Sequence, residues 1–475
     1  NAKGDLDGAI DSYKQAIKIK PDYAEAYNNM ALVLNDLNYF DAAIENFKLA
    51  LMIDPKSYSA YNNMGIALHD KGEPDAAIDS YQRAIKLKPD YADAYNNMGR
   101  SLNNKGDFDA AIDSYNKALQ LKPDCAETHT NMGNSLTIRG DLDDAIKSFN
   151  NALKIKPDCG DAHFNKSIAL LLLENFELGW AMYEWRWKTV LRSGRFLRSS
   201  KPVWNNEQKK SVFVWGEQGI GDQIMFGSLI PDMHASCSKL IVQTDKRLIP
   251  LFKRSFPDNV HSISNIEYIS EEEYDAHIPI GSLPQYFRKT IDSFTKTSGS
   301  YLKADKSLSF SLRKTLLDND SQIICGITWR GGNKKDSAAK HKSIELAKIA
   351  QVLSRKNVKL VNLQYGDTDQ EVNDLRTKHN INIFNVSEVD TFNDLDGLAA
   401  LICACDHVVS VDNLTVHLSG ALGIKTSVLL PFSCDWRWGM TSKTSYWHSS
   451  ISLYRQVKIF DWSDPLEELK KDFSY

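Results

Sequence analysis

An apolar run meets a glycine-rich turn in the stretch 212–226, VFVWGEQGIGDQIMF, and Asp222 stands where the next helix is expected to begin. A carboxylate at this place has two interpretations that do not exclude each other. It caps the helix by accepting hydrogen bonds from free N–H groups, or it faces a cleft and takes the proton of an attacking hydroxyl. Because a helix N-terminus stabilises the charged carboxylate, Asp222 would be a weakened base, and Glu217 and His417 remain alternatives for that role.

The glycine spacing of this turn differs from two common phosphate-binding motifs. Its order is G-x-x-G-x-G, whereas dinucleotide-binding folds use G-x-G-x-x-G, and no Lys-Ser/Thr follows as in a P-loop. What the turn supplies is backbone freedom at the carboxyl end of a strand, with Asp222 at the start of the next helix.

A second group of polar residues follows the strands expected after residue 322. In an open parallel sheet, ligands bind outside the carboxyl ends of the strands. The segment VDNLTVH runs directly into a helix, so Thr415 and His417 lie in or near its first turn, where free N–H groups suit a phosphate. The residues predicted to line this anion site are Trp329, Arg330, Lys342, Gln364, Asp412, Asn413, Thr415 and His417.

The loop from Arg330 to Lys342 adds positive charge beside that helix. It also carries Lys334, Lys335 and Lys340. So much charge would hold a diphosphate without a metal, although most lysines in such a loop are solvated. We therefore expect Arg330 and Lys342, which flank the loop, to make the contacts.

The first 190 residues repeat with a period of 34. The period links Pro21, Pro55, Pro89, Pro123 and Pro157, as well as Ala9, Ala43, Ala77, Ala111 and Ala145. Small residues, aromatics and a late proline at this spacing are typical of the tetratricopeptide (TPR) repeat. We predict an α-helical TPR superhelix of about five to six repeats over residues 1–190, the first truncated, with an extended concave surface for a partner.

A column of asparagines follows the same period: Asn29, Asn63, Asn97, Asn131 and Asn165. With Tyr27, Met30 and Leu34 on the core side of the helix, Asn29 points about 150° away from that side. An amide offers a donor and an acceptor, so a column of them can bind the backbone of an extended peptide whatever its side chains. Repeats arise by duplication, so the five copies are not independent observations. We interpret the column as a peptide-binding ladder.

The remainder of the chain alternates short β-rich runs with helical stretches, which predicts parallel sheets. We expect an α/β fold of two Rossmann-like domains, 191–315 and 316–475, with a cleft between them. The run INIF at 381–384 is expected to be one of the strands. Trp180, Tyr183 and Trp187 share one helical face, which favours packing of the array onto the next domain over a sugar-stacking platform.

Composition narrows the class of protein. The net charge of -4, with both signs mixed along the chain, argues against a nucleic-acid partner. Seven scattered cysteines favour a reducing compartment and thus a cytoplasmic location, and no apolar run reaches membrane-spanning length. The chain starts inside a repeat, so we expect the natural N-terminus to lie upstream.

Several motifs carry a family resemblance. SVDNLTVHLSGALG, DWRWGM, YWHSS and LYRQ resemble the donor-binding half of GT-B glycosyltransferases, above all the TPR-fused bacterial enzymes with heptosyltransferase-like C-terminal motifs. The ladder resembles that of O-GlcNAc transferase. The resemblance implies a nucleotide-sugar co-substrate, no cofactor or metal, and inversion at the anomeric carbon. It places Asp412, Thr415 and His417 in the donor site and Lys342 near a phosphate. It makes Asp222 the usual candidate base, on a turn that faces the acceptor.

These observations lead to one predicted function and two alternatives. The leading prediction is a protein glycosyltransferase that acts on a hydroxyl of a protein held by the TPR array, with flagellin or another surface protein as acceptor. The first alternative is transfer to a glycan or lipopolysaccharide, and the second is a non-catalytic scaffold with a vestigial cleft. The segments Asp367-Thr-Asp369 and Asp394-Leu-Asp396 weakly favour a reaction that depends on a metal ion. Assembly into a homo-oligomer stays open.

Overall fold

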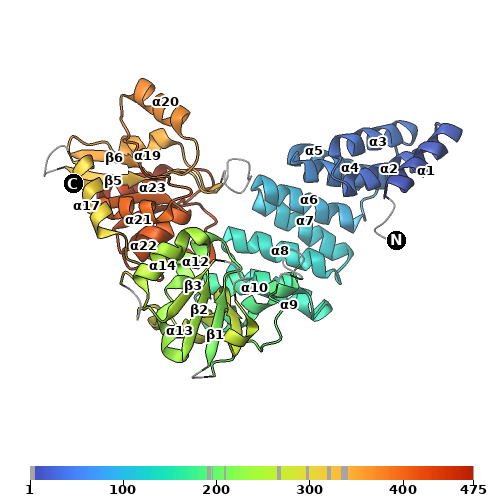
Figure 1. Ribbon diagram of the computed structural model, residues 1–475. Coiled ribbons are helices and arrows are strands. Elements are labelled where there is room, and N and C mark those ends of the chain that lie inside the picture. Colours follow the sequence, from blue (N-terminus) through green and yellow to red (C-terminus); the bar gives the residue numbers. More distant parts are fainter. Residues whose placement is uncertain are drawn as a thin grey trace. The chain divides into compact units, whose positions relative to one another are not determined.

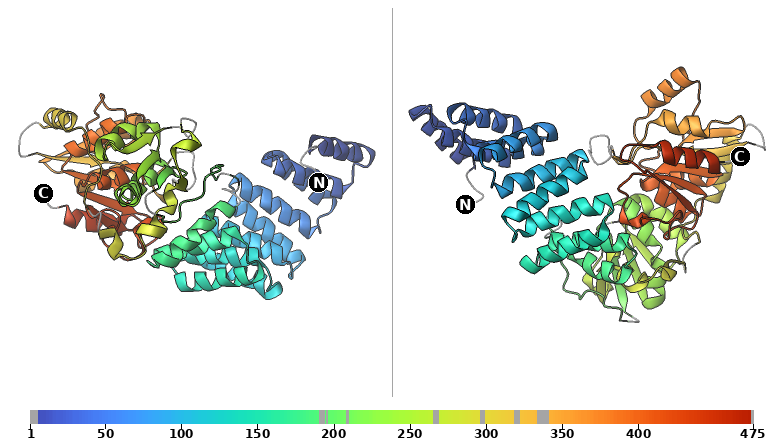
Figure 2. Two further views of the ribbon diagram at one scale, coloured as in Figure 1. Left: turned by 60° about the horizontal axis from the view of Figure 1, so that its bottom comes forward. Right: turned by 180° about the vertical axis from the view of Figure 1, so that it is seen from behind.

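The computed structural model describes residues 6–189, 194, 196–207, 210–264, 269–295, 299–317, 322–332 and 341–473. It divides into two compact units, residues 1–169 with 188–191 and residues 170–187 with 192–475. Figures 1 and 2 show the first as paired antiparallel helices and the second as strands covered by helices. The segment 170–187, which was expected to belong to the TPR array, belongs to the second unit.

Helices of 13 or 14 residues build the first unit, and each repeat pairs an even-numbered helix with the odd-numbered one that follows. Gly106 ends α6 in the left-handed conformation at φ 89°, which other residues adopt only at a cost. The helices are α1 (Leu6–Ile19), α2 (Ala24–Asp36), α3 (Phe40–Ile53), α4 (Tyr58–Lys71), α5 (Pro74–Leu87), α6 (Ala92–Lys105), α7 (Phe108–Leu121), α8 (Ala126–Arg139), α9 (Leu142–Ile155) and α10 (Gly160–Leu172).

Small residues set the distance between paired helices, as the repeat pattern predicts. Ala77 and Ala111 are fully buried. A Cβ on Gly99 of α6 would lie 2.6 Å from Cε1 of Tyr115 on α7, so only glycine leaves room for the ring. Tyr81 and Phe149, at the same position of their repeats, pack against Gly65 and Gly133 in the same way, and these contacts hold the helix pairs together.

The second unit begins with two short helices, α11 (Phe176–Tyr183) and the 3-10 helix η1 (Glu184–Lys188). Trp180 and Tyr183 are buried and contact the ring of Trp436 at centroid distances of 5.2 and 6.0 Å. The indole N–H of Trp180 donates to the backbone oxygen of Arg288 at 2.7 Å. These aromatic side chains are thus core residues of the second unit.

The first sheet of this unit has four parallel strands in the order β3-β2-β1-β4. Its strands are β1 (Ser211–Trp215), β2 (Lys239–Gln243), β3 (Val260–Ile263) and β4 (Ala276–Pro279). The connecting helices are α12 (Ile220–Gly227), α13 (Ile230–Ser236), η2 (Lys246–Leu248), α14 (Ile249–Ser255), η4 (Glu271–Glu273), η5 (Ile280–Ser282), α15 (Pro284–Phe287) and α16 (Asp292–Thr295). We call this sheet with its helices the first lobe.

The second sheet has five parallel strands in the order β6-β5-β7-β8-β9. Its strands are β5 (Ile323–Ile327), β6 (Val358–Asn362), β7 (His407–Val411), β8 (Thr426–Leu430) and β9 (Ile451–Arg455). Its helices are α17 (Lys306–Leu316), α19 (Leu346–Leu353), α20 (Asp369–His379), α21 (Leu395–Ala404), α22 (Leu414–Ala421), η6 (Trp436–Trp438) and α23 (Ser463–Asp472). We call this part the second lobe.

Two details of the second lobe differ from the sequence predictions. The run INIF forms only an isolated bridge, between Phe384 and Val361, and not a strand. Helix α17 packs against α21 and so joins the second lobe, although most of it precedes residue 316. The alternation of strands and helices, and the parallel sheets that it predicts, are confirmed.

The contact between Gly99 and Tyr115 generates a stability prediction. Gly99→Ala gains up to about 1 kcal/mol in helix propensity but forces the Tyr115 ring to move, which costs about 1–3 kcal/mol. We expect a net loss of about 1–2 kcal/mol in the free energy of unfolding of the first unit, measured by urea titration with far-UV circular dichroism. Asn116→Ala, an exposed change on α7, is the control and should be neutral. A Gly99→Ala protein as stable as this control would contradict the packing argument.

Candidate functional site

A buried ion pair fixes the turn between β1 and α12. The Arg186 guanidinium is fully buried, contacts the Glu217 carboxylate at 3.1 Å and donates to Oγ of Ser282 at 2.7 Å. The backbone N–H of Gly281 also donates to Glu217, at 3.5 Å. Burial raises the pKa of Glu217, and Arg186 offsets only part of this effect. Glu217, the alternative base, is therefore engaged in holding the turn.

Asp222 lies at the third position of α12 and pairs with a cation of the second lobe. Gly219 is the N-cap of this helix and no side chain caps it, so the N-cap interpretation of Asp222 is wrong. The Asp222 carboxylate instead forms a salt bridge with Arg437 of η6, which is 215 residues further along the chain. The side chain of Asp222 is 19% exposed and that of Arg437 is 13% exposed.

The two lobes come into contact where α12 and α22 begin. These helices pack together, and a Cβ on Gly221 would lie 3.3 Å from Cδ2 of His417 and 3.8 Å from Cα of Leu414. Each helix follows a strand of its own sheet, β1 or β7. The loops at the carboxyl ends of the two sheets are thereby brought together, with Asp222 and His417 on neighbouring helices.

Asn413 organises the start of α22. Its Oδ1 caps the helix by accepting the Thr415 N–H at 3.0 Å, and it also accepts from Ser410 Oγ at 3.1 Å. Its Nδ2 donates to Thr328 Oγ1 at 3.0 Å and to the backbone oxygen of Arg330 at 3.1 Å. The Asn413 amide is thus fully engaged, and it links the ends of β5 and β7.

Lys342 and Asp412 form a second ion pair, beside α22. Lys342 Nζ lies 2.6 Å from Asp412 Oδ2, and the indole N–H of Trp438 donates to Asp412 Oδ1 at 3.1 Å. Burial opposes the charge on both groups. The attraction between them nevertheless raises the pKa of Lys342 and lowers that of Asp412, so the pair is charged. Gly331 permits this approach, because a Cβ there would lie 2.7 Å from Cβ of Lys342.

Two buried polar atoms at the start of α22 lack a hydrogen-bond partner among the described residues: Thr415 Oγ1 and His417 Nδ1. Thr415 is completely buried and His417 is 6% exposed. Burial lowers the pKa of His417 to about 4, and the His417 ring stacks on Trp438 with an interplanar angle of 14°. A neutral imidazole and a hydroxyl at a helix N-terminus are groups that can bind an anionic or polar ligand.

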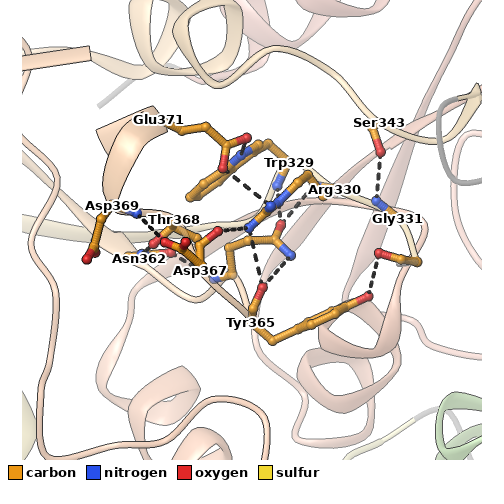
Figure 3. A network of polar contacts seen from close by, with 12 residues as sticks. Trp329, Arg330, Gly331, Ser343, Asn362, Tyr365, Asp367, Thr368, Asp369 and Glu371 are labelled. Atoms are coloured by element: carbon orange, nitrogen blue, oxygen red, sulfur yellow. Dashed lines mark hydrogen bonds and ion pairs between the residues drawn. The ribbon is translucent and has the colours of Figure 1, made fainter. Parts of the chain in front are cut away.

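Trp329, Arg330 and Gln364 form a separate cluster, shown in Figure 3, which labels the first two. Gln364 Oε1 accepts the backbone N–H groups of Trp329 at 3.0 Å and of Arg330 at 2.8 Å. The indole N–H of Trp329 donates to Glu371 at 3.0 Å, and the Arg330 guanidinium contacts the same carboxylate at 3.4 Å. Arg330 also donates to the backbone oxygen of Asp367 at 2.9 Å. These contacts fasten the end of β5 to the start of α20.

The eight residues predicted for the anion site thus fall into two groups. Lys342, Asp412, Thr415 and His417 gather around the start of α22, with Asn413 supporting them. Trp329 is 1% exposed and belongs to the core of the second lobe, where Arg330 and Gln364 hold the neighbouring loop. Lys334, Lys335 and Lys340 lie outside the described residues.

The carboxylates that suggested a metal site have other partners. Asp367 accepts the Asp369 backbone N–H at 3.1 Å. Asp394 caps α21 by accepting the Gly397 N–H at 2.8 Å, and Asp396 forms a salt bridge with Arg254 at 2.6 Å. Within the described ranges, no three His, Cys, Asp or Glu side chains are grouped so that they could hold a metal ion. The prediction of a metal-independent reaction stays a prediction.

The asparagine ladder lies on the first helix of each repeat, α2, α4, α6, α8 and α10, and its members are exposed or half-buried. A second column stands one position earlier. Asn97 donates from Nδ2 to Oδ1 of Asn62 at 3.1 Å, and Asn131 donates to Asn96 in the same way at 3.1 Å. Asn63 donates to Asn28 at 3.3 Å. Each of these ladder amides is thus oriented by a neighbour in the preceding repeat, which the sequence analysis did not foresee.

Two further residues of the site also escaped the sequence analysis. Arg437 and Trp438 lie in the motif DWRWGM, which was noted only as part of the family resemblance. Their sequence signal is an arginine between two tryptophans after the end of β8, but the partners Asp222 and Asp412 are distant in sequence. Arg186 was also missed, because nothing in the run EWRWK indicates an ion pair with Glu217.

Comparison with known proteins identifies the first unit. Tetratricopeptide-repeat models match residues 1–38 and 65–102, residues 24–57, and residues 92–125 and 126–159. The first unit is a tetratricopeptide-repeat array. Arrays of this kind bind peptide or protein partners. In the parts of the chain that the structure describes, no helix is both long and apolar enough to span a membrane.

Protein FlbA of Caulobacter vibrioides is similar to a larger part of the chain. It is 27% identical over 309 residues, which cover 61% of this chain and 51% of FlbA. The chain thus spans about half the length of this relative, and the match is longer than the TPR array, so it includes part of the second unit. Among solved structures, MamA is 35% identical, with 33% of this chain and 91% of MamA covered and a TM-score of 0.31. YrrB, described as a TPR protein with an unusual peptide-binding site, is 23% identical, with 37% and 91% covered and a TM-score of 0.31.

The lowered pKa of His417 predicts how stability depends on pH. Below about pH 6.5 the unfolded chain binds a proton at this residue, whereas the folded protein does not until about pH 4. Stability is therefore lost as the pH falls from 6.5 to 4, by about 3 kcal/mol from this residue. We expect His417→Gln to lose less stability than wild type over this window.

All ten tryptophans lie in the second unit, so tryptophan fluorescence during urea unfolding reports this unit alone. His261→Gln, at an exposed position of β3, is the matched control and should follow the wild-type pH curve. Parallel pH curves for wild type and His417→Gln would show that His417 is not held neutral.

Proposed function

We propose that the chain is a glycosyltransferase that moves a sugar from a nucleotide-sugar to a hydroxyl of a protein bound by its TPR array. One observation carries the proposal. A carboxylate of the first lobe, Asp222, lies beside the start of α22 in the second lobe, where Thr415 Oγ1 and His417 Nδ1 are buried and find no hydrogen-bond partner among the residues that the structure describes. A candidate base and a candidate phosphate site are therefore adjacent, on helices that follow strands of two different parallel sheets.

The donor side of the proposal rests on α22. Its first N–H groups and its dipole favour a phosphate, and Asn413 fixes the direction in which the helix begins. The Thr415 hydroxyl would donate a hydrogen bond to a phosphate oxygen. Lys342 and Arg437 supply positive charge nearby, without a metal, and the family resemblance assigns a nucleotide-sugar to this place.

The acceptor side rests on Asp222. In the proposed reaction the acceptor hydroxyl oxygen forms a bond to the anomeric carbon, and the bond from that carbon to the phosphate oxygen breaks. The nucleoside diphosphate leaves with the bonding electrons, and Asp222 takes the hydroxyl proton. The buried pair Arg186–Glu217 holds the turn that carries Asp222 and so fixes its position.

The TPR array supplies the acceptor. TPR arrays bind peptide or protein partners, and this favours a protein over a glycan as the molecule that receives the sugar. The family resemblance suggests flagellin or another surface protein. The match to FlbA extends beyond the array, which supports the view that the two units act together.

Asp222→Asn tests the proposed base. The amide cannot take a proton, so we expect sugar transfer to fall by about a hundredfold or more. Nucleoside diphosphate binding should not weaken, because in the proposed complex Asp222 contacts the acceptor and not the donor. Transfer is measured with radiolabelled nucleotide-sugar, and binding by calorimetry. Asp258→Asn, an exposed carboxylate of the first lobe, is the control. If Asp222→Asn transferred sugar at the wild-type rate, Asp222 would not be the base.

The ladder can be tested with two matched double variants. Asn97→Ala with Asn131→Ala removes two ladder amides and their bonds to the preceding repeat, whereas Asn62→Ala with Asn96→Ala removes the same two bonds from the other side. If the ladder binds the acceptor backbone, the first variant should raise KM for the protein acceptor by about tenfold and the second by much less. Hydrolysis of the nucleotide-sugar alone should not change in either variant.

Equal losses in the two variants would show that the asparagines matter only through the shape of the array. Equal losses of transfer and of donor hydrolysis would show that the ladder does not act on the acceptor at all.

A further inference from the structure

Arg437 pairs with two carboxylates in the second unit. It forms salt bridges with Asp222 of the first lobe and with Asp435 of its own loop. Its guanidinium carbon lies 4.6 Å from the ring centroid of Trp436. Burial disfavours its charge, but the two carboxylates outweigh burial and raise the pKa of Arg437. The guanidinium is thus a permanent cation with little access to water.

The hydrogen bonds of Arg437 are not complete. Its Nε is buried and has no hydrogen-bond partner among the described residues. Thr415 Oγ1 and His417 Nδ1 are in the same condition, and His417 is close enough to Arg437, Asp222 and Asp412 for their charges to affect its pKa. A buried guanidinium with an unused N–H, beside a helix N-terminus with an unused hydroxyl, is suited to an oxyanion with several acceptor oxygens.

The ion pairs at this place carry more negative than positive charge, which opposes the binding of a diphosphate. In these ion pairs, Asp222, Asp412 and Asp435 contribute three negative charges, and Lys342 and Arg437 contribute two positive ones. A further anion beside this arrangement would meet cations that are already neutralised. Binding becomes favourable only when at least one cation exchanges a carboxylate for the phosphate oxygens.

We propose that Arg437 is that cation: it releases Asp222 and binds the diphosphate of the nucleotide-sugar, so donor binding frees the carboxylate that then accepts the hydroxyl proton. This inference rests on the proposed function and adds an order of events to it. Before the donor binds, the Asp222 carboxylate is engaged by the Arg437 guanidinium. After the donor binds, the same arginine stabilises the leaving diphosphate and Asp222 faces the acceptor.

Lys342 is less suited to this exchange. Its partner Asp412 is held at its second oxygen by the Trp438 indole N–H, and both members of the pair belong to the second lobe. The Arg437–Asp222 pair joins two lobes, so its exchange can accompany a change in their contact. A planar guanidinium can also bind two phosphate oxygens at once, which an ammonium group cannot do in the same geometry.

A double-mutant cycle on nucleoside diphosphate affinity tests the exchange. The proteins are the full chain as wild type, Asp222→Asn, Arg437→Gln and the double variant. Each is titrated by calorimetry with UDP, GDP, ADP and dTDP. If Arg437 must leave Asp222 to bind the diphosphate, Asp222→Asn should bind the preferred nucleotide about fivefold tighter than wild type, and Arg437→Gln about tenfold weaker or worse.

The double variant distinguishes two reasons for tighter binding by Asp222→Asn: release of Arg437 from Asp222, and loss of the repulsion between the Asp222 carboxylate and the diphosphate. Removal of a negative charge strengthens anion binding even without an exchange, but that gain would persist when Arg437 is absent. The proposal therefore expects the gain from Asp222→Asn to disappear in the Arg437→Gln background. An equal gain in both backgrounds, or no gain in either, overturns the exchange while leaving the donor site intact.

The same titrations show separately whether the proposed function is wrong, because wild type would then bind none of the four nucleotides. Tryptophan fluorescence during urea unfolding checks that each protein is folded. If Arg437→Gln does not fold, Arg437→Lys takes its place, and the gain from Asp222→Asn should shrink because the shorter ammonium group loses Asp222 as a partner. A gain as large as in wild type would overturn the proposal.

Discussion

The close approach of α12 and α22 is the constraint on which the candidate site depends. Glycine at position 221 eases this approach, because a Cβ there would lie 3.3 Å from Cδ2 of His417, closer than an ordinary contact. Both helices begin just after strands of parallel sheets, so their contact brings two helix N-termini and two sets of strand-end loops together. Only the contact between the lobes places Asp222 beside Arg437 and the start of α22.

Buried charge is the second determinant of this region. Charges that leave water require partners, and Arg186–Glu217, Lys342–Asp412 and Asp222–Arg437 each meet that requirement with a carboxylate and a cation. The pairs nevertheless differ in what surrounds them. In the Arg186–Glu217 pair, Arg186 also donates to Ser282 Oγ and pairs with Glu184, and the Gly281 N–H donates to Glu217. Asp222–Arg437 joins two lobes and lies near Thr415 Oγ1 and His417 Nδ1, which have no hydrogen-bond partner in the described parts of the chain, so a ligand that binds these atoms could rearrange this pair.

The sequence predicted local features well and long-range partners poorly. The period of 34, the alternation of strands and helices, and the start of a helix after VDN are properties of neighbouring residues, and the structure has them. INIF failed as a strand because its backbone forms only one bridge to β6. Trp329 and Arg330 follow a strand as expected, yet Glu371 engages both, and no local pattern marks that contact. The partner of Asp222 is 215 residues away, so only the fold could reveal it.

The asparagine columns show how one residue type can serve the array in two ways. The inner column, Asn62 and Asn96, is buried and accepts hydrogen bonds from the next repeat, so it fixes the spacing of successive helices. In the outer column, Asn97 and Asn131 each donate one amide hydrogen to that bond. The bond also fixes the direction of the Oδ1 atom and of the second amide hydrogen, which remain able to bind a peptide. An amide oriented in advance loses less entropy when it binds a peptide backbone. The bonds that stiffen the array would therefore also strengthen its hold on an extended chain, and stability and binding need not compete at these positions.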